Sequence, residues 1–299
     1  MAGARLTLTD QGTNQKREQT TGPDGNYEFR ALPRGMYGLT VEHPGFKREV
    51  VSDILLQVAQ IHRLDLTLQV GAVTESVEVV GSVGLLKVSE ASLSQMIDEK
   101  RVLELPLNGR HFIGLVHLAP GVITAGRASA TQRHANYGAG FSTGGQRDNT
   151  SVVLLDGIEI SGQEINNYPL AIPSLESVAE FRVQTSNYSA EFGGNSRAVI
   201  NVASRRGSNA FHGTLFEFLR NDKLDARNFF IARPVPLKRN QFGYQLSNPV
   251  YLPGLFDGRN RTFFMYSHEW LIQRSAISGT TIVPTERERA GDFSGVTQA

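Results

Sequence analysis

Several residue types and patterns are missing from this 299-residue sequence, and each absence excludes a class of protein. There is no cysteine, which excludes disulfides, thiolate catalysis, iron–sulfur clusters and cysteine zinc sites. No apolar run approaches the roughly 20 residues that a membrane-spanning helix requires. The first ten residues contain no apolar segment of a signal peptide. A net charge of +1, from 30 basic and 29 acidic residues, argues against a dedicated nucleic-acid binder.

The motifs of common enzyme and metal sites are missing as well. The sequence contains no His-Glu-x-x-His pair, no Gly-x-Ser-x-Gly nucleophile elbow and no phosphate-binding P-loop. The seven histidines are scattered, and His111 and His117 do not have the i, i+4 spacing of a helical metal pair. The sequence therefore predicts no enzyme activity, no cofactor and no metal.

The composition that remains is that of a folded protein with many turns. Apolar residues make up 40% of the chain and charged residues 20%, which permits a sizeable core. The 30 glycines and 12 prolines suit many turns between short strands. We therefore expect a mainly β fold divided into several parts.

Residues 1–70 carry the pattern of half-buried strands. Apolar residues recur at every second position in four runs: Leu6–Leu8, Tyr27–Phe29, Tyr37–Val41 and Leu64–Val70. Gly22-Pro-Asp-Gly25 has the residues of a tight turn between two of these runs. The pattern predicts a small antiparallel β-sandwich.

The detailed string of this region indicates a family. Gly22-Pro-Asp-Gly-Asn-Tyr-Glu-Phe29, Leu32-Pro-Arg-Gly-Met-Tyr-Gly-Leu-Thr-Val41 and Pro44-Gly-Phe46 resemble the carboxypeptidase-regulatory-like domain. That resemblance implies a non-catalytic, transthyretin-like sandwich of seven strands. Domains of this family normally begin with one further strand before the segment that matches Ala2–Thr9. The resemblance therefore implies that the first strand of the sandwich is missing.

Residues 71–86 are predicted to form a linker. Between its glycines lies the acidic and apolar segment Thr74-Glu-Ser-Val-Glu-Val-Val80. Three interpretations remain open for this segment. It can be a plain connecting strand, a last strand of the sandwich, or a peptide that adds to the sheet edge of another protein.

In residues 87–205 the apolar period changes, and we expect an α+β domain. Asp98 is a suitable N-cap for a helix over Glu99–Leu103. Asn108 can cap a second helix from about Gly109 to Leu118, because its apolar residues have helical spacing. Ser174 can cap a third, short helix that ends at Ala179. The expected strands are 151–155, 158–160, 181–185 and 199–202, with Asp156-Gly157 as the turn between the first two.

Four motifs follow one another in this region. They are Leu105-Pro-Leu-Asn-Gly-Arg-His-Phe112, Leu118-Ala-Pro-Gly-Val122, Leu155-Asp-Gly157 and Asn187-Tyr-Ser-Ala-Glu-Phe-Gly193. Together they resemble the plug domain of TonB-dependent outer-membrane receptors, in the Oar-like branch, which carries a regulatory-like domain in front. The motif residues that we single out, with an expected structural role, are Asn108, Gly109, Arg110, Asp156, Gly157, Glu191 and Gly193.

The resemblance also implies a partner. TonB-dependent receptors are energised by a TonB-type protein that adds a strand to a short TonB box. A TonB-box-like segment is expected between the sandwich and the plug, at Glu75, Ser76, Val77, Glu78, Val79 and Val80.

Residues 206–299 resemble the start of the β-barrel of the same receptors. Phe242, Tyr244 and Leu246 alternate with polar or small residues, as a strand does that faces lipid on one side. Aromatic residues crowd 262–270, which suits the girdle of a barrel. A receptor barrel has about 22 strands, so we expect an incomplete barrel and a chain trimmed at both ends. The resemblance implies location in the bacterial outer membrane, lipid around the complete barrel, and uptake of an unidentified solute.

One alternative function accompanies this interpretation. The chain can be a soluble binding or adhesion module, in which the sandwich recognises its target and transport plays no part. Among individual residues, Arg110 and Arg147 are expected to form internal ion pairs or hydrogen bonds rather than to contact a substrate. Asp156-Gly157 is expected to be a hairpin turn rather than a cation site.

Overall fold

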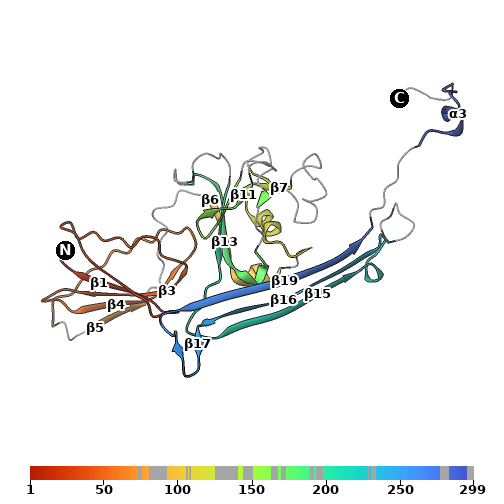
Figure 1. Ribbon diagram of the computed structural model, residues 1–299. Helices are drawn as coiled ribbons and strands as arrows, with labels where there is room; N and C mark the ends of the chain where they lie inside the picture. Colours follow the sequence, from red (N-terminus) through yellow and green to blue (C-terminus); the bar gives the residue numbers. More distant parts are fainter. Residues whose placement is uncertain are drawn as a thin grey trace. The chain divides into compact units, whose positions relative to one another are not determined.

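Strands are the main regular element of the residues that the structure describes (Figure 1). The computed structural model describes residues 1–72, 76–80, 93–105, 107, 109–124, 141–143, 151–162, 168–169, 173–188, 192, 198–227, 229, 234–276 and 283–294. Within these ranges strands far outnumber helices, which confirms the predicted mainly β fold. No helix in the described ranges is long and apolar enough to cross a membrane.

The elements follow one another in a mixed order. The strands are β1 (Arg5–Asp10), β2 (Lys16–Thr20), β3 (Gly35–Glu42), β4 (Arg48–Leu56), β5 (Ser76–Val80), β6 (Leu93–Ile97), β7 (Val122–Thr124), β8 (Phe141–Thr143), β9 (Val152–Leu155), β10 (Ile158–Glu159), β11 (Ser161–Gly162), β12 (Tyr168–Pro169), β13 (Val178–Ser186), β14 (Val199–Ser204), β15 (His212–Asn221), β16 (Leu237–Pro249), β17 (Tyr251–Leu252), β18 (Phe256–Asp257) and β19 (Phe263–Ser275). The helices are α1 (Glu99–Glu104) and α3 (Glu286–Arg289), with 3-10 helices η1 (Phe112–Leu118), η3 (Leu175–Ser177) and η5 (Asp222–Leu224).

The N-terminal region forms one five-stranded sheet in the order β2-β1-β3-β4-β5. The pairs β1–β2, β1–β3 and β3–β4 are antiparallel, as predicted, with Leu8 of β1 opposite Leu39 of β3. Alternate side chains of these strands point into one apolar core, in which Leu6, Leu39 and Val51 are almost fully buried. The sheet is the sandwich layer that the sequence pattern predicts most clearly.

The second layer of the sandwich differs from the prediction. The segment Leu64–Val70 has alternating burial, and its leucines pack on the core, yet only Val70 forms a β-bridge, with Phe46. Tyr27 and Phe29 also pack on the core without belonging to a strand. The alternation of apolar and polar residues indicates which side chains are buried. It does not show that the backbone is paired, because pairing also requires a neighbouring strand in register. The layer is therefore extended chain tied by side chains, such as the Tyr27 hydroxyl that donates to the Leu64 carbonyl at 2.9 Å.

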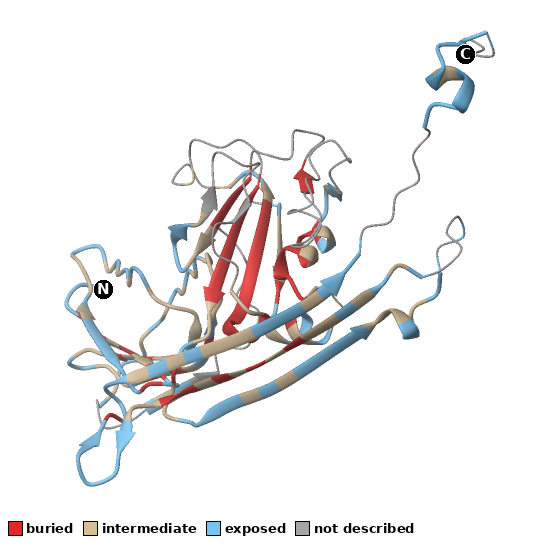
Figure 2. Ribbon diagram, turned by 45° about the vertical axis from the view of Figure 1, so that its right-hand side comes forward, coloured by how far each residue is buried: buried red, intermediate tan, exposed pale blue. Residues whose placement is uncertain are grey.

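The region predicted to be a plug, which we call the plug region or plug, forms a second five-stranded sheet in the order β10-β9-β14-β13-β6, with β9 and β14 parallel. Its strands β13 and β14 are buried along most of their length, except at their C-terminal ends (Figure 2). One face packs on α1, η1 and η3 around a single core, in which Phe112 and Phe181 meet edge to face with 5.8 Å between their centroids. The predicted strands of this region and the Asp98 cap of α1 are confirmed; the Asp98 side chain accepts from the Arg101 amide at 2.9 Å.

Two predicted helices of the plug are wrong in part. The segment expected to run from Gly109 begins only at Phe112 and is a 3-10 helix. Gly109 and Arg110 have φ angles of 91° and 54°, a left-handed conformation that cannot continue into a right-handed helix. The predicted cap Asn108 lies outside the described residues, and His111 takes the N-cap position without a side-chain bond. The predicted buried face of Phe112, Leu115, Val116 and Ala119 is correct.

The helix predicted from Ser174 to Ala179 is shorter than expected. It is a single 3-10 turn, Leu175–Ser177, and Val178 and Ala179 already belong to β13. Ser174 does not cap it, because its hydroxyl is bonded to that of Ser267 instead, at 2.7 Å. β-branched and aromatic residues after Ala179 extend the strand backward at the expense of the helix.

The C-terminal region contains a three-stranded sheet in the order β15-β16-β19. Its strands have 10, 13 and 13 residues, long enough for a tilted strand to cross a bilayer core. On β16 the polar residues Gln241, Gln245 and Ser247 are buried, while Phe242 and Tyr244 alternate with them on the other face. The predicted alternation of this strand is confirmed.

The chain divides into two units, and the boundary passes through the long strands. One unit comprises residues 1–215 and 244–268, and the other comprises residues 216–243 and 269–299. The sandwich and the plug both lie in the first unit, together with one end of each long strand.

Candidate functional site

The segment predicted to resemble a TonB box forms the edge strand β5. Its residues pair in parallel with β4, from Arg48 opposite Ser76 to Ser52 opposite Val80. Ser76 and Glu78 are exposed and Val77 is half-buried, so the strand lies on the surface of the sandwich. Of the three interpretations left open by the sequence, the structure shows the last strand of the sandwich. The first residue of the predicted segment, Glu75, lies outside the described residues.

The sheet has two edges, and they differ in chemistry. At one edge, β2 carries the exposed charged residues Lys16, Arg17 and Glu18, and charges at an edge hinder the addition of a further strand. At the other edge, β5 has the sequence Ser-Val-Glu-Val-Val, with a single charge. No strand in the described ranges pairs with the outer side of β5. The β5 edge is therefore the better acceptor of an additional strand.

The plug motif around Gly109 places one arginine in a buried ion pair. Arg110 and Glu176, of η3, are joined by a short contact between Nη2 and Oε1, with side chains only 8% and 4% exposed. Arg110 itself has a left-handed φ of 54°, a conformation that residues other than glycine rarely adopt. Arg110 therefore links the start of η1 to the start of β13.

The motif residues Asp156 and Gly157 form the turn between β9 and β10. Both have positive φ, 50° and 85°, as in the two-residue hairpin turns that match the twist of the strands. The Asp156 carboxylate accepts from the amide and the hydroxyl of Ser204, at 2.9 and 2.6 Å. These two hydrogen bonds connect the β9–β10 hairpin to the end of β14.

The remaining predicted site residues cannot be placed. Asn108, Glu191, Gly193 and Arg147 lie outside the described residues. Among the residues that are described, no group of three potential metal ligands occurs.

The three-stranded sheet carries an aromatic face. Phe242 of β16 stacks on Trp270 of β19, with centroids 5.4 Å apart. Tyr244 lies next to Tyr266 and His268 of β19, at 5.8 and 6.4 Å. Trp270 and Tyr266 remain 42% and 50% exposed, which is unusual for rings of this size in a protein surrounded by water. This face suits a lipid environment.

Sequence reasoning missed the buried polar residues whose bonding partners are distant in the sequence. Glu176, Glu180 and Arg182 lie in or beside predicted elements, but their partners are far away in the chain. The available signal was weak: Glu180 and Arg182 alternate with Phe181 and Val183, a pattern that predicts solvent exposure.

Comparison with known proteins completes this picture. The family model described as "Carboxypeptidase regulatory-like domain" matches residues 1–69, and that described as "Outer membrane beta barrel domain" matches residues 203–299. The TonB-dependent transporter Oar of Myxococcus xanthus is 32% identical over 287 residues, which cover 89% of this chain. This chain is a homologue of an Oar-like TonB-dependent transporter. The predicted family resemblance is thereby confirmed.

The homologue is much longer than this chain. The matched region spans 26% of the length of the Myxococcus transporter. Two solved receptors are also similar: the siderophore receptor PirA of Acinetobacter baumannii, with 20% identity over 53% of this chain and 22% of that chain, and a mutant of the ferric enterobactin receptor PfeA of Pseudomonas aeruginosa, with 17% identity over 61% and 24%. Both have a TM-score of 0.40.

Proposed function

We propose that this chain is part of an outer-membrane receptor that takes up a solute and is energised by a TonB-type partner. The observation that carries the proposal is the match of residues 203–299 to an outer-membrane barrel family, over the same residues that form the aromatic sheet. Lipid explains an exposed aromatic face that water disfavours. The alternative of a soluble binding module leaves this face unexplained.

We further propose that the TonB-type partner binds at β5. Its outer edge offers backbone donors and acceptors, and a partner strand that pairs with them extends the sandwich sheet. The plug, with its buried Arg110–Glu176 pair, would close the lumen of the complete barrel. No residue of this proposal performs covalent chemistry.

Proline variants test the β5 site. Successive N–H groups of a strand point to opposite edges, so of Val77→Pro and Glu78→Pro one removes a donor of the outer edge and the other a donor to β4. The variant that removes the outer donor should weaken binding of the periplasmic domain of a TonB-type protein from the same bacterium. Loss of one hydrogen bond predicts a decrease in affinity of roughly fivefold. Binding is measured by titration calorimetry on the detergent-solubilised chain.

The opposite edge of the same sheet provides the control. Lys16→Pro and Arg17→Pro disturb β2 equally and should leave the affinity unchanged. An equal decrease in affinity for variants at both edges, or an affinity that the β5 variants leave unchanged, would show that the partner does not bind at β5.

A further inference from the structure

Two charged residues of the plug are buried on the face of the sheet that should point to solvent. On β13, Phe181 and Val183 enter the plug core, and Glu180 and Arg182 alternate with them on the opposite face. Glu180 is 4% exposed and Arg182 is 2% exposed. Buried charges persist only when they are paired or hydrogen-bonded, so a neighbouring part of the chain must cover them.

The sandwich provides that cover. The amide of Val58 donates to Glu180 Oε1 at 2.6 Å, and Arg182 Nη1 donates to the carbonyl oxygen of Ala59 at 2.5 Å. Arg34, in the loop before β3, adds a longer ion pair to Glu180 Oε2 at 3.6 Å. One acid and one base of the plug thus bind the two ends of a short backbone segment. We call Glu180 and Arg182 of the plug, together with Arg34, Val58 and Ala59 of the sandwich, the clasp.

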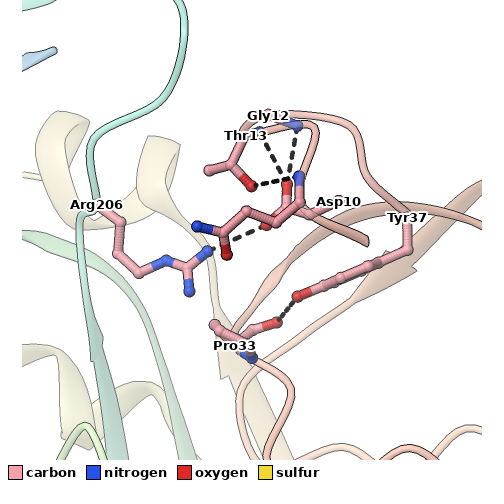
Figure 3. A network of polar contacts seen from close by, with 7 residues as sticks. Asp10, Gly12, Thr13, Pro33, Tyr37 and Arg206 are labelled. Carbon is pink, nitrogen blue, oxygen red and sulfur yellow. Dashed lines mark hydrogen bonds and ion pairs between the residues drawn. The ribbon is translucent and has the colours of Figure 1, made fainter. Parts of the chain in front are cut away.

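A second contact lies at the β1–β2 turn (Figure 3). Asp10 Oδ1 accepts from the amides of Gly12 and Thr13, at 2.8 and 3.2 Å, which shapes the turn. Its Oδ2 then pairs with Arg206, on the segment after β14, at 3.3 Å. The carbonyl of Gly12 accepts from the amide of Asn209 at 2.9 Å. The sandwich is thus held at two separate places.

The clasp lies close to β5 in the covalent chain. β5 pairs with β4 as far as Ser52, β4 ends at Leu56, and Val58 and Ala59 follow at once. A force applied to β5 therefore passes to β4 through their strand pairing, and from the end of β4 to β13 through the few residues up to Val58 and Ala59. Ala59 has a φ of 50°, so this connection has a fixed, turned shape.

We propose that the clasp docks the sandwich on the plug, and that strand addition at β5 acts on β13 through β4 and the segment Val58–Ala59. The docking stands by itself, while the action on β13 rests on the proposed function. The sandwich is then docked on the plug and can transmit a force to it, instead of being joined to it only by a flexible linker.

An engineered disulfide tests the docking. A Cβ placed on Gly12 would lie 3.8 Å from the Cβ of Ser208, the separation found across disulfides, which is about 3.8 Å. Since the chain has no native cysteine, the double variant Gly12→Cys/Ser208→Cys can form only this bond within one molecule. We expect rapid oxidation to a monomer that migrates faster on a non-reducing gel. Failure to oxidise in the folded chain, or formation of dimers alone, would overturn the docking.

The same disulfide reports on the clasp. Adding Glu180→Gln, which removes the charge, or Arg34→Ala, which leaves the plug intact, should slow oxidation. The pair should slow it roughly tenfold, since hydrogen bonds to charged groups are stronger than neutral ones. The matched control is Glu99→Ala, which breaks an ion pair to Arg205 within the plug and touches no part of the sandwich. Near-ultraviolet circular dichroism confirms that each variant is folded. Equal rates in clasp and control variants would refute the clasp.

Hydrogen exchange tests the action on β13. The periplasmic domain of a TonB-type protein is added to the solubilised chain, and exchange of the β13 amides is followed. We expect a change in the parent and none in the Glu180→Gln/Arg34→Ala variant, although both bind the domain equally. Binding without any change at β13 would overturn the coupling. Absence of binding in the parent would overturn the proposed function and, with it, the coupling, while the disulfide result still decides the docking.

Discussion

The plug sheet and the three-stranded sheet have the same alternation but opposite surroundings. β13 and β14 are buried on both faces, one against the plug core and one against polar partners. On β19, in contrast, Tyr266, Trp270 and Ile272 are between 42% and 52% exposed. The comparison shows that period two defines the faces of a strand and leaves open what covers them: core, domain or lipid.

The largest expected effect is on solubility. Because the aromatic face has no cover in water, the chain should aggregate without detergent and become monodisperse when detergent is added. Replacing Tyr266, Trp270 and Ile272 with serine should reduce this requirement, as light scattering would show. The control changes Ser267 and Gln273, on the other face of β19, to threonine and serine. Equal behaviour of the two variants would mean that the aromatic face does not drive aggregation.

Truncation of one aromatic ring sharpens the comparison between the sheets. Phe181 is fully buried, so Phe181→Ala should lower the free energy of unfolding of the plug by about 3–5 kcal/mol. Trp270→Ala, on the exposed face, should leave plug unfolding unchanged in detergent. Both are measured by urea unfolding with a fluorescent probe on the plug. A large decrease in the unfolding free energy of the plug in Trp270→Ala would contradict this difference between the two sheets.

The buried ion pair of the plug should be nearly as sensitive. Glu176→Ala removes one charged partner of the buried Arg110 and should cost about 3 kcal/mol of plug stability, since a buried charge that loses an ion-pair partner is destabilising. The double variant Arg110→Met/Glu176→Leu should recover most of this loss. Additive losses in a double-mutant cycle would instead show that the two residues act independently. The exposed pair Arg287–Asp292 serves as a control and should give no measurable change.

The smallest expected effect concerns the sandwich at alkaline pH. Burial, with the nearby Asp65 and Glu49, raises the pKa of Tyr27 from 10.0 to about 12. Between these values the folded chain keeps a proton that the unfolded chain has lost, so stability should fall as the pH rises through this range. Tyr27→Phe should flatten this slope and cost about 1 kcal/mol at neutral pH through loss of its hydrogen bond.

Thermal unfolding between pH 9 and 12 measures the Tyr27 effect. Exposed Tyr251, on β17, offers the control, because its replacement by phenylalanine removes a hydroxyl without opening the sandwich core. A Tyr27→Phe variant whose alkaline slope equals that of the parent would contradict the assignment.

Local pattern predicted much of this fold, and long-range pairing accounts for what it missed. Asp98, the turn at Asp156-Gly157 and the alternation around Tyr244 act over a few residues, so the sequence reveals them. The 3-10 form of η1 depends on backbone angles at Gly109 and Arg110 that no period displays. The parallel pairing of β5 depends on β4, which is distant in the sequence, and the alternation within β5 does not indicate which strand is its partner.

The residues of the candidate site show the same difference between local patterns, which the sequence reveals, and long-range contacts, which it does not. The segment Ser76–Val80 could be found because it combines apolar alternation with a position between two recognisable domains. Glu180 and Arg182 could not be found, because their burial results from docking of the sandwich and not from their own strand. Arg110 drew attention through its motif, whereas its partner Glu176 lies in a segment without one.

The edge position of β5 has a consequence for local unfolding. Within the described residues β5 pairs only with β4, whereas β1, β3 and β4 each pair on both sides. Opening β5 therefore breaks one ladder of hydrogen bonds, and the other four strands of the sheet remain paired. A partner strand would compete for a strand whose release costs the sheet one ladder instead of two.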